Sequence, residues 1–103
     1  MKLSKQDQAI VLAQGEGYFL CKSTGDVYST KRGIHKIRQG EDSAGYRYIG
    51  VKLPGEHKFT KTYLHLIVAY NKFGDQIFTP GVIVYHRDSN TLNNNYDNIG
   101  VSS

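Results

Sequence analysis

Residues 82–99 are the segment that most constrains how this chain can fold. A short apolar stretch, Val82 to Tyr85, precedes His86, and the chain then enters a loop crowded with acids and amides: Asp88, Asn90, Asn93, Asn94, Asn95, Asp97 and Asn98. Asparagine tolerates left-handed backbone conformations and bonds nearby backbone groups, so this composition favours an ordered loop. The segment therefore predicts a short strand that delivers one histidine into an asparagine-rich loop.

The composition favours a small α+β protein. A chain of 103 residues with 39% apolar residues has room for one domain with one modest core. Glycine and asparagine are plentiful and long stretches with a helical period are scarce, so strands and loops are expected to dominate. We expect a small antiparallel sheet with a short N-terminal helix and one buried helix.

Charge and cysteine content indicate the class of partner and the compartment. The formal charge of +4 favours an anionic partner such as nucleic acid, because clustered cations release counterions from phosphates. The single cysteine, Cys21, excludes an internal disulfide and a multi-cysteine zinc site. The apolar run from Ala9 to Ala13 is too short for a signal peptide or a membrane span. A soluble, cytoplasmic protein without a membrane partner is expected.

The N-terminal third predicts a helix and a hairpin. Ser4 can cap a helix that runs to about Gln14, with its hydroxyl accepting from the backbone N–H of Asp7. The period then changes, and residues 18–29 alternate around a glycine turn, as in a β-hairpin.

Residues 31–38 form a strongly basic segment, which contains His35 together with Lys31, Arg32, Lys36 and Arg38. Such a segment can serve as an arm that contacts phosphates, or it can be an ordinary solvated loop. Residues 39–45 are predicted to form a polar turn.

Two strands and a helix are predicted next. Residues 46–53 alternate so that one face is mostly aliphatic, and a second strand begins within residues 57–63 with Phe59 as its apolar anchor. Residues 63–73 are apolar almost all round and predict a buried helix that ends at Gly74. His65, a polar side chain within the apolar part of this run, is either a core histidine with a satisfied hydrogen bond or a ligand.

The asparagine-rich segment resembles a known motif. From His86 it reads H-x-D-x-N-x-x-N-N-x-x-x-N-I, similar to the pattern H-x-D-G-N-x-x-N-N-x-x-x-N-L of the phage-borne HNH homing-endonuclease family. The order of a Gly-Tyr strand start at Gly45, the pattern H-x-x-V-A from His65 and the His86 motif is also similar. The resemblance implies a single HNH-like domain over residues 1–103, with a β-rich part (17–62), a helix (63–73) and an HNH-like β-hairpin (82–102).

The resemblance also implies roles. His86 would be the general base of a phosphodiester hydrolase, and Asn98 would hold the two strands of the hairpin together and fix which ring nitrogen of His86 faces water. Asp88 lies two residues beyond His86, on the same face in extended geometry, and would orient the imidazole, ligate Mg²⁺ or only form a turn. A divalent metal ion, Mg²⁺ first, is the implied cofactor.

The remaining residues of the predicted site fall into two groups. Side chains expected to support the site are His65, Tyr85, Asn90 and Asn94. Side chains expected to contact double-stranded DNA are Lys31, Arg32, Lys36, Arg38 and Arg87. A homodimer is a further possibility, in which a second subunit would supply a missing metal ligand.

The chain departs from the family pattern at two points. Tyr85 stands where many HNH enzymes have an Asp or His that binds the metal, and the sequence ends at Ser103, where the family continues into a helix with the last ligand. The motif is therefore expected to be truncated or degenerate. Three hypotheses follow: a metal-dependent DNA endonuclease, an inactive HNH-derived module that binds DNA or inhibits a host defence protein, and a structural phage protein.

Overall fold

The computed structural model describes residues 3–103 and confirms the α+β class. Two α-helices are present, α1 (Lys5–Leu12) and α2 (Leu64–Phe73), together with the 3₁₀ helices η1 (Gly74–Phe78) and η2 (Tyr96–Asn98). The strands are β1 (Tyr18–Leu20), β2 (Val27–Ser29), β3 (His35–Lys36), β4 (Gly40–Glu41), β5 (Arg47–Lys52), β6 (Phe59–Tyr63), β7 (Ile83–His86) and β8 (Ile99–Ser102).

The strands form antiparallel sheets in the orders β1-β2-β3, β4-β5-β6 and β7-β8. The β-rich part thus contains two three-stranded sheets, where the sequence predicted one small sheet. The difference arises at β3 and β4, which lie in the basic segment and in the predicted polar turn. Each spans two residues, too few to show an alternating pattern.

The predicted helix cap is confirmed. The Ser4 hydroxyl accepts a hydrogen bond from the backbone N–H of Asp7 at 3.1 Å. The helix ends at Leu12, earlier than predicted, and Gly15 closes the final turn with a bond from its N–H to the Leu12 carbonyl. The apolar side of α1 then packs on the sheets through Ala9 and Ala13.

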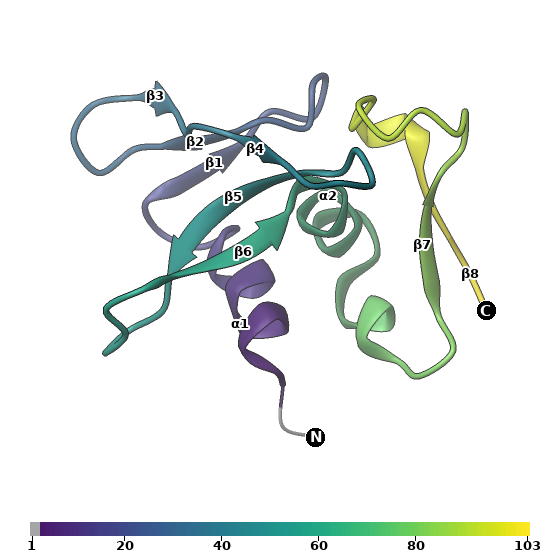
Figure 1. Cartoon of the computed structure of the whole chain (residues 1–103), viewed down its shortest axis with the longest axis horizontal. Helices are drawn as coiled ribbons and strands as arrows, with labels where there is room; N and C mark the ends of the chain where they lie inside the picture. Colours follow the sequence, from purple (N-terminus) through teal and green to yellow (C-terminus); the bar gives the residue numbers. More distant parts are fainter. Residues whose placement is uncertain (1–2) are drawn as a thin grey trace.

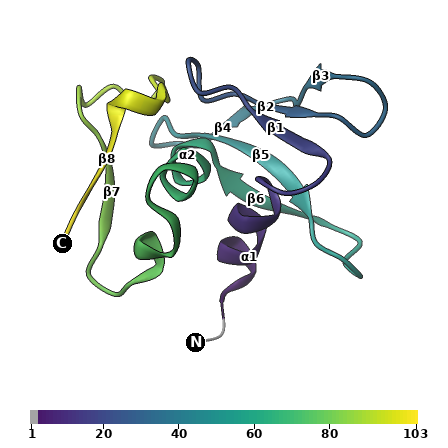
Figure 2. The same ribbon diagram turned by 180° about the vertical axis from the view of Figure 1, so that it is seen from behind.

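Helix α2 lies between two clusters of buried side chains. One cluster joins α1, β2 and β5 to α2 through Leu64 and Ile67. The other joins α2 to the C-terminal hairpin, where Val68 and Ala69 pack against Ile99. Because both sides of the helix are covered, its sequence is apolar almost all round, as predicted. Figures 1 and 2 show α2 between the β5–β6 sheet and the β7–β8 hairpin.

Strand β6 corrects one expectation. Phe59, expected to be its apolar anchor, has an exposed fraction of 70%. The register pairs Val51 with Thr60 and Ile49 with Thr62, so the threonines share the buried face and Phe59 lies on the other one. Thr62 is 1% exposed and its hydroxyl donates to the Thr60 carbonyl, which satisfies this polar side chain inside the core.

Among residues 3–103, no helix is long and apolar enough to cross a membrane.

Candidate active site

His86 is the last residue of β7 and faces the interior. Along this strand Ile83 and Tyr85 are 62% and 41% exposed, whereas His86 is only 8% exposed. Alternation of side chains along the strand accounts for this, because Val84 and His86 point toward α2. Tyr85 points away and covers Gly100 on the partner strand, where an added Cβ would lie 3.0 Å from the tyrosine ring.

The imidazole of His86 has one polar partner in the described part of the chain. Its Nε2 lies 2.8 Å from Oδ1 of Asn94, which is 3% exposed. An amide oxygen only accepts hydrogen bonds, so Nε2 carries the proton in the neutral ring. The second ring nitrogen, Nδ1, has no hydrogen-bond partner within residues 3–103, and its lone pair is therefore available as a base.

Two further rings lie against His86. The ring centroid of His65, in the first turn of α2, is 5.1 Å from that of His86, and the centroid of Tyr46 is 5.9 Å away. Tyr46 and His65 are themselves 4.9 Å apart, so the three rings contact one another. The sequence singled out both histidines, but its residue types gave no sign that Tyr46 would reach them.

His65 is uncharged at neutral pH. Burial lowers the pKa of His65 to about 4, and the charge of His86 acts in the same direction, while Asp42 opposes both. The predicted hydrogen bond of a core histidine is not seen for this side chain within residues 3–103. Contacts with aromatic rings hold it instead, including Tyr63 at 5.6 Å.

Asp88 is held within the loop and has no bond to His86. Its Oδ1 accepts from the N–H of Asn90 and from Asn98, at 2.8 and 2.9 Å, and its Oδ2 accepts from Asn93 at 2.9 Å. The hydrogen bond from the Asn93 side chain, with those from Asn90 and Asn98, holds the pKa of Asp88 below its ordinary value. The expected shared face with His86 is wrong because β7 ends at His86 and the chain turns there.

Asn98 ties the two sides of the hairpin together, as expected from the motif. Its Oδ1 accepts from the N–H of Asp88 at 3.2 Å, and its Nδ2 donates to the Asn93 carbonyl at 2.8 Å. The task of fixing the His86 tautomer, also assigned to Asn98, falls to Asn94 in the structure. Asn90 stays within the turn, where its side chain accepts from the N–H of Leu92.

Turns from the β-rich part form hydrogen bonds to the asparagine-rich loop and pack against it. Thr91 donates its hydroxyl to the Gly45 carbonyl at 2.9 Å, and Asn95 donates its side-chain amide to the Ser23 carbonyl at 2.8 Å. Gly25 packs directly on Asn94, because an added Cβ would lie 2.3 Å from the Asn94 carbonyl oxygen. The loop therefore depends on residues distant in sequence for its shape.

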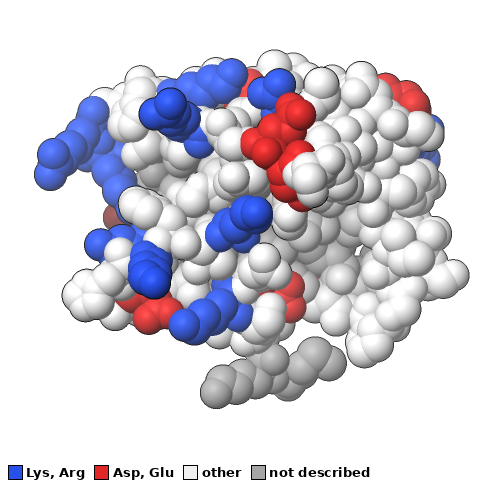
Figure 3. Space-filling view, viewed as in Figure 1, with Lys and Arg blue, Asp and Glu red and all other residues white. Residues whose placement is uncertain are grey.

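The basic side chains of the predicted nucleic-acid surface lie in two places. The loop before β3 lies at the opposite end of the molecule from the β7–β8 hairpin (Figure 1). Lysine and arginine gather over the β1–β6 half of the face in Figure 3, and the hairpin half carries few. The exposed side chains at the first end are Lys31, Arg32, Lys36 and Arg38, while Arg87 is exposed beside His86.

Within residues 3–103, no group of three or more His, Cys, Asp or Glu side chains is placed to hold a metal ion. Both oxygens of Asp88 already accept hydrogen bonds from the loop. These residues therefore do not form a prearranged metal site.

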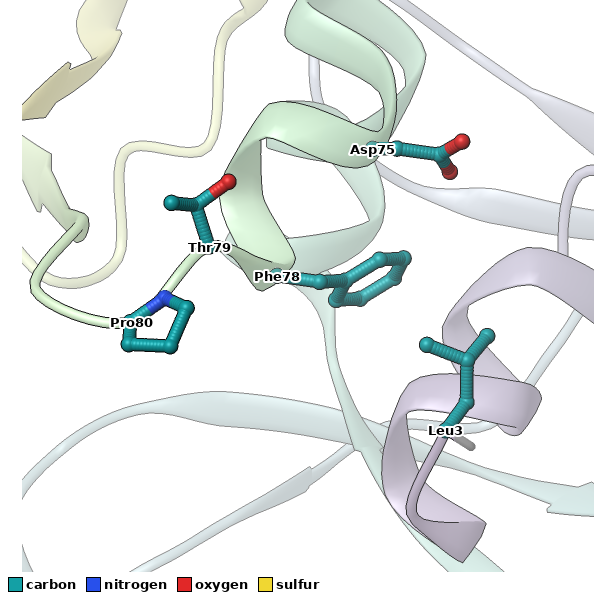
Figure 4. Close-up of a pocket in the computed structure, with 5 residues that line it drawn as sticks. All are labelled: Leu3, Asp75, Phe78, Thr79 and Pro80. Atoms are coloured by element: carbon teal, nitrogen blue, oxygen red, sulfur yellow. The ribbon is translucent and has the colours of Figure 1, made fainter. Parts of the chain in front are cut away.

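A surface hollow of about 390 Å³ lies away from His86, between the start of α1 and η1. Figure 4 shows its lining, in which Leu3 and Phe78 supply the apolar surface and Asp75 the one charge. The hollow shares no residue with the histidine site.

Comparison with known proteins agrees with this description. Residues 62–103 match a family model described as HNH endonuclease. The fold is similar to the solved structure reported for DNA binding and cleavage by the HNH homing endonuclease I-HmuI, with a TM-score of 0.70 and 25% identity over 100% of this chain. The chain spans 53% of that relative's length. Comparison with curated protein sequences gives no significant match.

The C-terminal part of the chain, residues 62–103, thus carries the pattern of an HNH endonuclease family. The structural likeness to an HNH homing endonuclease extends over the whole chain.

Proposed function

We propose that this chain binds DNA and hydrolyses its phosphodiesters, with His86 as the general base. The observation that carries the proposal is the pair formed by His86 and Asn94. Because Asn94 accepts from Nε2–H, the Nδ1 lone pair of His86 can take a proton from water. The water oxygen would then attack phosphorus, and the bond to the leaving oxygen of the sugar would break.

Asn94 also suits the charge that develops in this reaction. A phosphodiester resists attack because its anionic oxygens repel nucleophiles. Water must therefore lose a proton to a base in order to attack, and the base holds this proton during the attack. The ring of His86 becomes a cation when it takes this proton. A hydrogen bond from Nε2–H to an amide oxygen strengthens when the ring is charged, which favours the transfer.

A divalent cation, Mg²⁺ first, is part of the proposal, since it would offset negative charge on the phosphate. Mg²⁺ in such sites is often bound by one or two carboxylates together with water and substrate phosphate oxygens. Asp88 is the proposed carboxylate, and it would have to exchange part of its loop hydrogen bonds for the ion. The other ligands are not provided by a prearranged cluster of described residues.

Duplex DNA is proposed to lie along the long axis of the molecule. The molecule extends 36 Å along this axis, and the basic segment and the His86 hairpin lie at its two ends (Figure 1). This length corresponds to about one turn of B-DNA, roughly 34 Å. Arg32 at one end and Arg87 at the other would then contact phosphates about one turn apart.

The test is incubation of the purified chain with supercoiled plasmid in the presence of Mg²⁺, Mn²⁺ or EDTA. Nicked and linear products are separated on a gel. We expect cutting with a divalent ion and none in EDTA. A folded protein that binds the plasmid without cutting it under any of these conditions would contradict the catalytic part of the proposal.

A second candidate is an HNH-derived module that acts only by binding, to DNA or to a host protein. Two observations favour it. Tyr85, a poor ligand for a hard cation, precedes His86, and the Asp88 carboxylate is already bonded within the loop. Under this candidate, binding would survive both EDTA and His86→Ala.

A further inference from the structure

Three rings from three separate elements meet at the candidate site. Tyr46 directly precedes β5, His65 lies in the first turn of α2, and His86 ends β7. The centroid separations are 4.9 Å for Tyr46 and His65, 5.1 Å for the two histidines, and 5.9 Å for Tyr46 and His86. Tyr46 lies outside the segment that matches the family model, so part of the ring cluster comes from the β-rich part.

The position of Tyr46 is fixed by its own turn. Asp42 accepts from the N–H of Tyr46 at 2.9 Å with Oδ1 and from the Tyr63 hydroxyl at 2.8 Å with Oδ2. One carboxylate thus joins the start of β5 to the end of β6, two residues before His65. The Gly45 carbonyl, next to Tyr46, accepts from Thr91 in the asparagine-rich loop. The turn and the loop are therefore held in a fixed relation.

We propose that Tyr46 and His65 are positioning residues for His86, forming an aromatic shelf that sets the direction of its free ring nitrogen. The rate consequences of this inference rest on the proposed function, whereas the geometry of the shelf does not. The bond to Asn94 fixes one atom of the imidazole, Nε2, but one bond leaves the ring free to tilt about that atom. Contacts with two further rings restrict this tilt.

The chemistry of the shelf fits this role. His65 is uncharged at neutral pH, because its burial disfavours the cation. A neutral ring next to His86 does not repel the charge that appears when His86 takes a proton. A ring face also attracts a neighbouring cation, which Tyr46 provides without competing for the proton.

Pairs of variants distinguish the effect of the ring's contacts from the effect of its nitrogen or oxygen atoms. His65→Phe and Tyr46→Phe keep a ring in place, whereas His65→Ala and Tyr46→Ala remove it. Tyr48→Ala is the matched control, since Tyr48 lies in β5, which Tyr46 directly precedes, and its ring contacts Tyr63 instead of the histidines.

The first readout is NMR relaxation of the His86 imidazole, which measures motion of the ring and needs no activity. We expect a rigid ring in the wild type, both Phe variants and the Tyr48→Ala control. Both Ala variants should show increased motion of the ring about its bond to Asn94. A ring in folded His65→Ala and Tyr46→Ala that is as rigid as in the wild type would overturn the shelf, as would Phe variants with a ring as mobile as in the Ala variants.

The second readout is cleavage kinetics. The Ala variants should lose about tenfold or more in kcat with KM within about twofold, because a misplaced base slows the chemistry without weakening binding. The Phe variants should stay within about threefold of wild type. Equal losses in the Phe and Ala variants would overturn the shelf in favour of a direct role for the ring heteroatoms. If the wild type does not cut DNA, the proposed function is refuted. The NMR comparison of the Phe and Ala variants then tests the shelf by itself.

Discussion

Oδ1 of Asn94 lies 2.8 Å from Nε2 of His86, and this contact joins the middle of the asparagine-rich loop to the end of β7. Both side chains are buried, at 3% and 8% exposure. The contact sets the tautomer of His86 and gives the loop an internal anchor. The properties of the candidate site follow from this pair and from what surrounds it.

Asn94→Ala should destabilise the fold. The variant leaves the buried Nε2–H of His86 without its acceptor, and an unsatisfied buried donor costs about 1–3 kcal/mol. Urea denaturation measures the change in the free energy of unfolding. Asn90→Ala serves as the comparison, because Asn90 is exposed and its side chain bonds only within its own turn. Equal losses of unfolding free energy in the two variants would show that the buried contact between Asn94 and His86 does not add to stability.

Gly25→Ala should cost more than Gly33→Ala, although both residues have a positive φ, +80° and +78°. Each alanine pays the left-handed backbone penalty of about 1–2 kcal/mol. Only at Gly25 does the new Cβ meet a neighbour, the Asn94 carbonyl oxygen at 2.3 Å, whereas nothing lies within 4 Å at Gly33. A difference of about 2 kcal/mol in unfolding free energy is expected. Similar losses would contradict close packing of the β1–β2 turn on the loop.

The stability of the protein should fall on acidification because of His65. In the folded state the pKa of His65 is lowered from 6.5 to about 4 by burial. As the pH falls below 6.5, the unfolded chain takes the proton first, so the free energy of unfolding decreases until the pH reaches about 4. The full loss is about 3 kcal/mol, at 1.36 kcal/mol per pKa unit.

His65→Phe should remove this loss and flatten the stability curve between pH 6.5 and about 4, the window set by the two pKa values of His65. The lowered pKa values of Asp42 and Asp88 act in a different window, since their stabilisation disappears only as the pH falls through and below their ordinary value of 3.8. Urea denaturation at a series of pH values measures the effect. A variant with the same acid dependence as wild type would show that His65 is not the group responsible.

The sequence predicted local structure well wherever one short segment determined it. Ser4 capped its helix, and Gly74 ended the second helix as predicted. Phe59 was misassigned because the buried face of its strand carries threonines. The hydroxyl of Thr62 donates to the backbone of its own strand, and residue type alone does not distinguish such a buried threonine from an exposed one.

The candidate site was predictable in its motif but not in its contacts. His86 was singled out because the spaced amides that follow it resemble the family motif. Which amide reaches its ring depends on the turn after β7, and Asn94 takes that place instead of Asn98. Tyr46 lies 40 residues before His86 in the sequence, and only packing of the turn before β5 against the loop brings the two together.

Arg32→Gln should reduce the salt dependence of DNA binding more than Lys36→Gln. Each phosphate contact contributes about 0.9 to the slope of log affinity against log salt. The ammonium of Lys36 lies 3.4 Å from a carboxylate oxygen of Asp26, which partly occupies it, whereas Arg32 is exposed in the loop before β3. Fluorescence anisotropy of a labelled duplex at several salt concentrations gives the slopes. Slopes unchanged in both variants would show that residues 31–38 make no phosphate contacts and form an ordinary solvated surface.

The most direct test of the central claim compares the plasmid nicking rates of wild type, His86→Ala and His57→Ala. His57 is exposed in the loop before β6, so its variant controls for the loss of a histidine elsewhere. Circular dichroism and the urea midpoint check that each variant is folded. We expect metal-dependent nicking to disappear in His86→Ala and to continue at the wild-type rate in His57→Ala. Nicking that persists in folded His86→Ala would contradict the assignment of His86 as the general base.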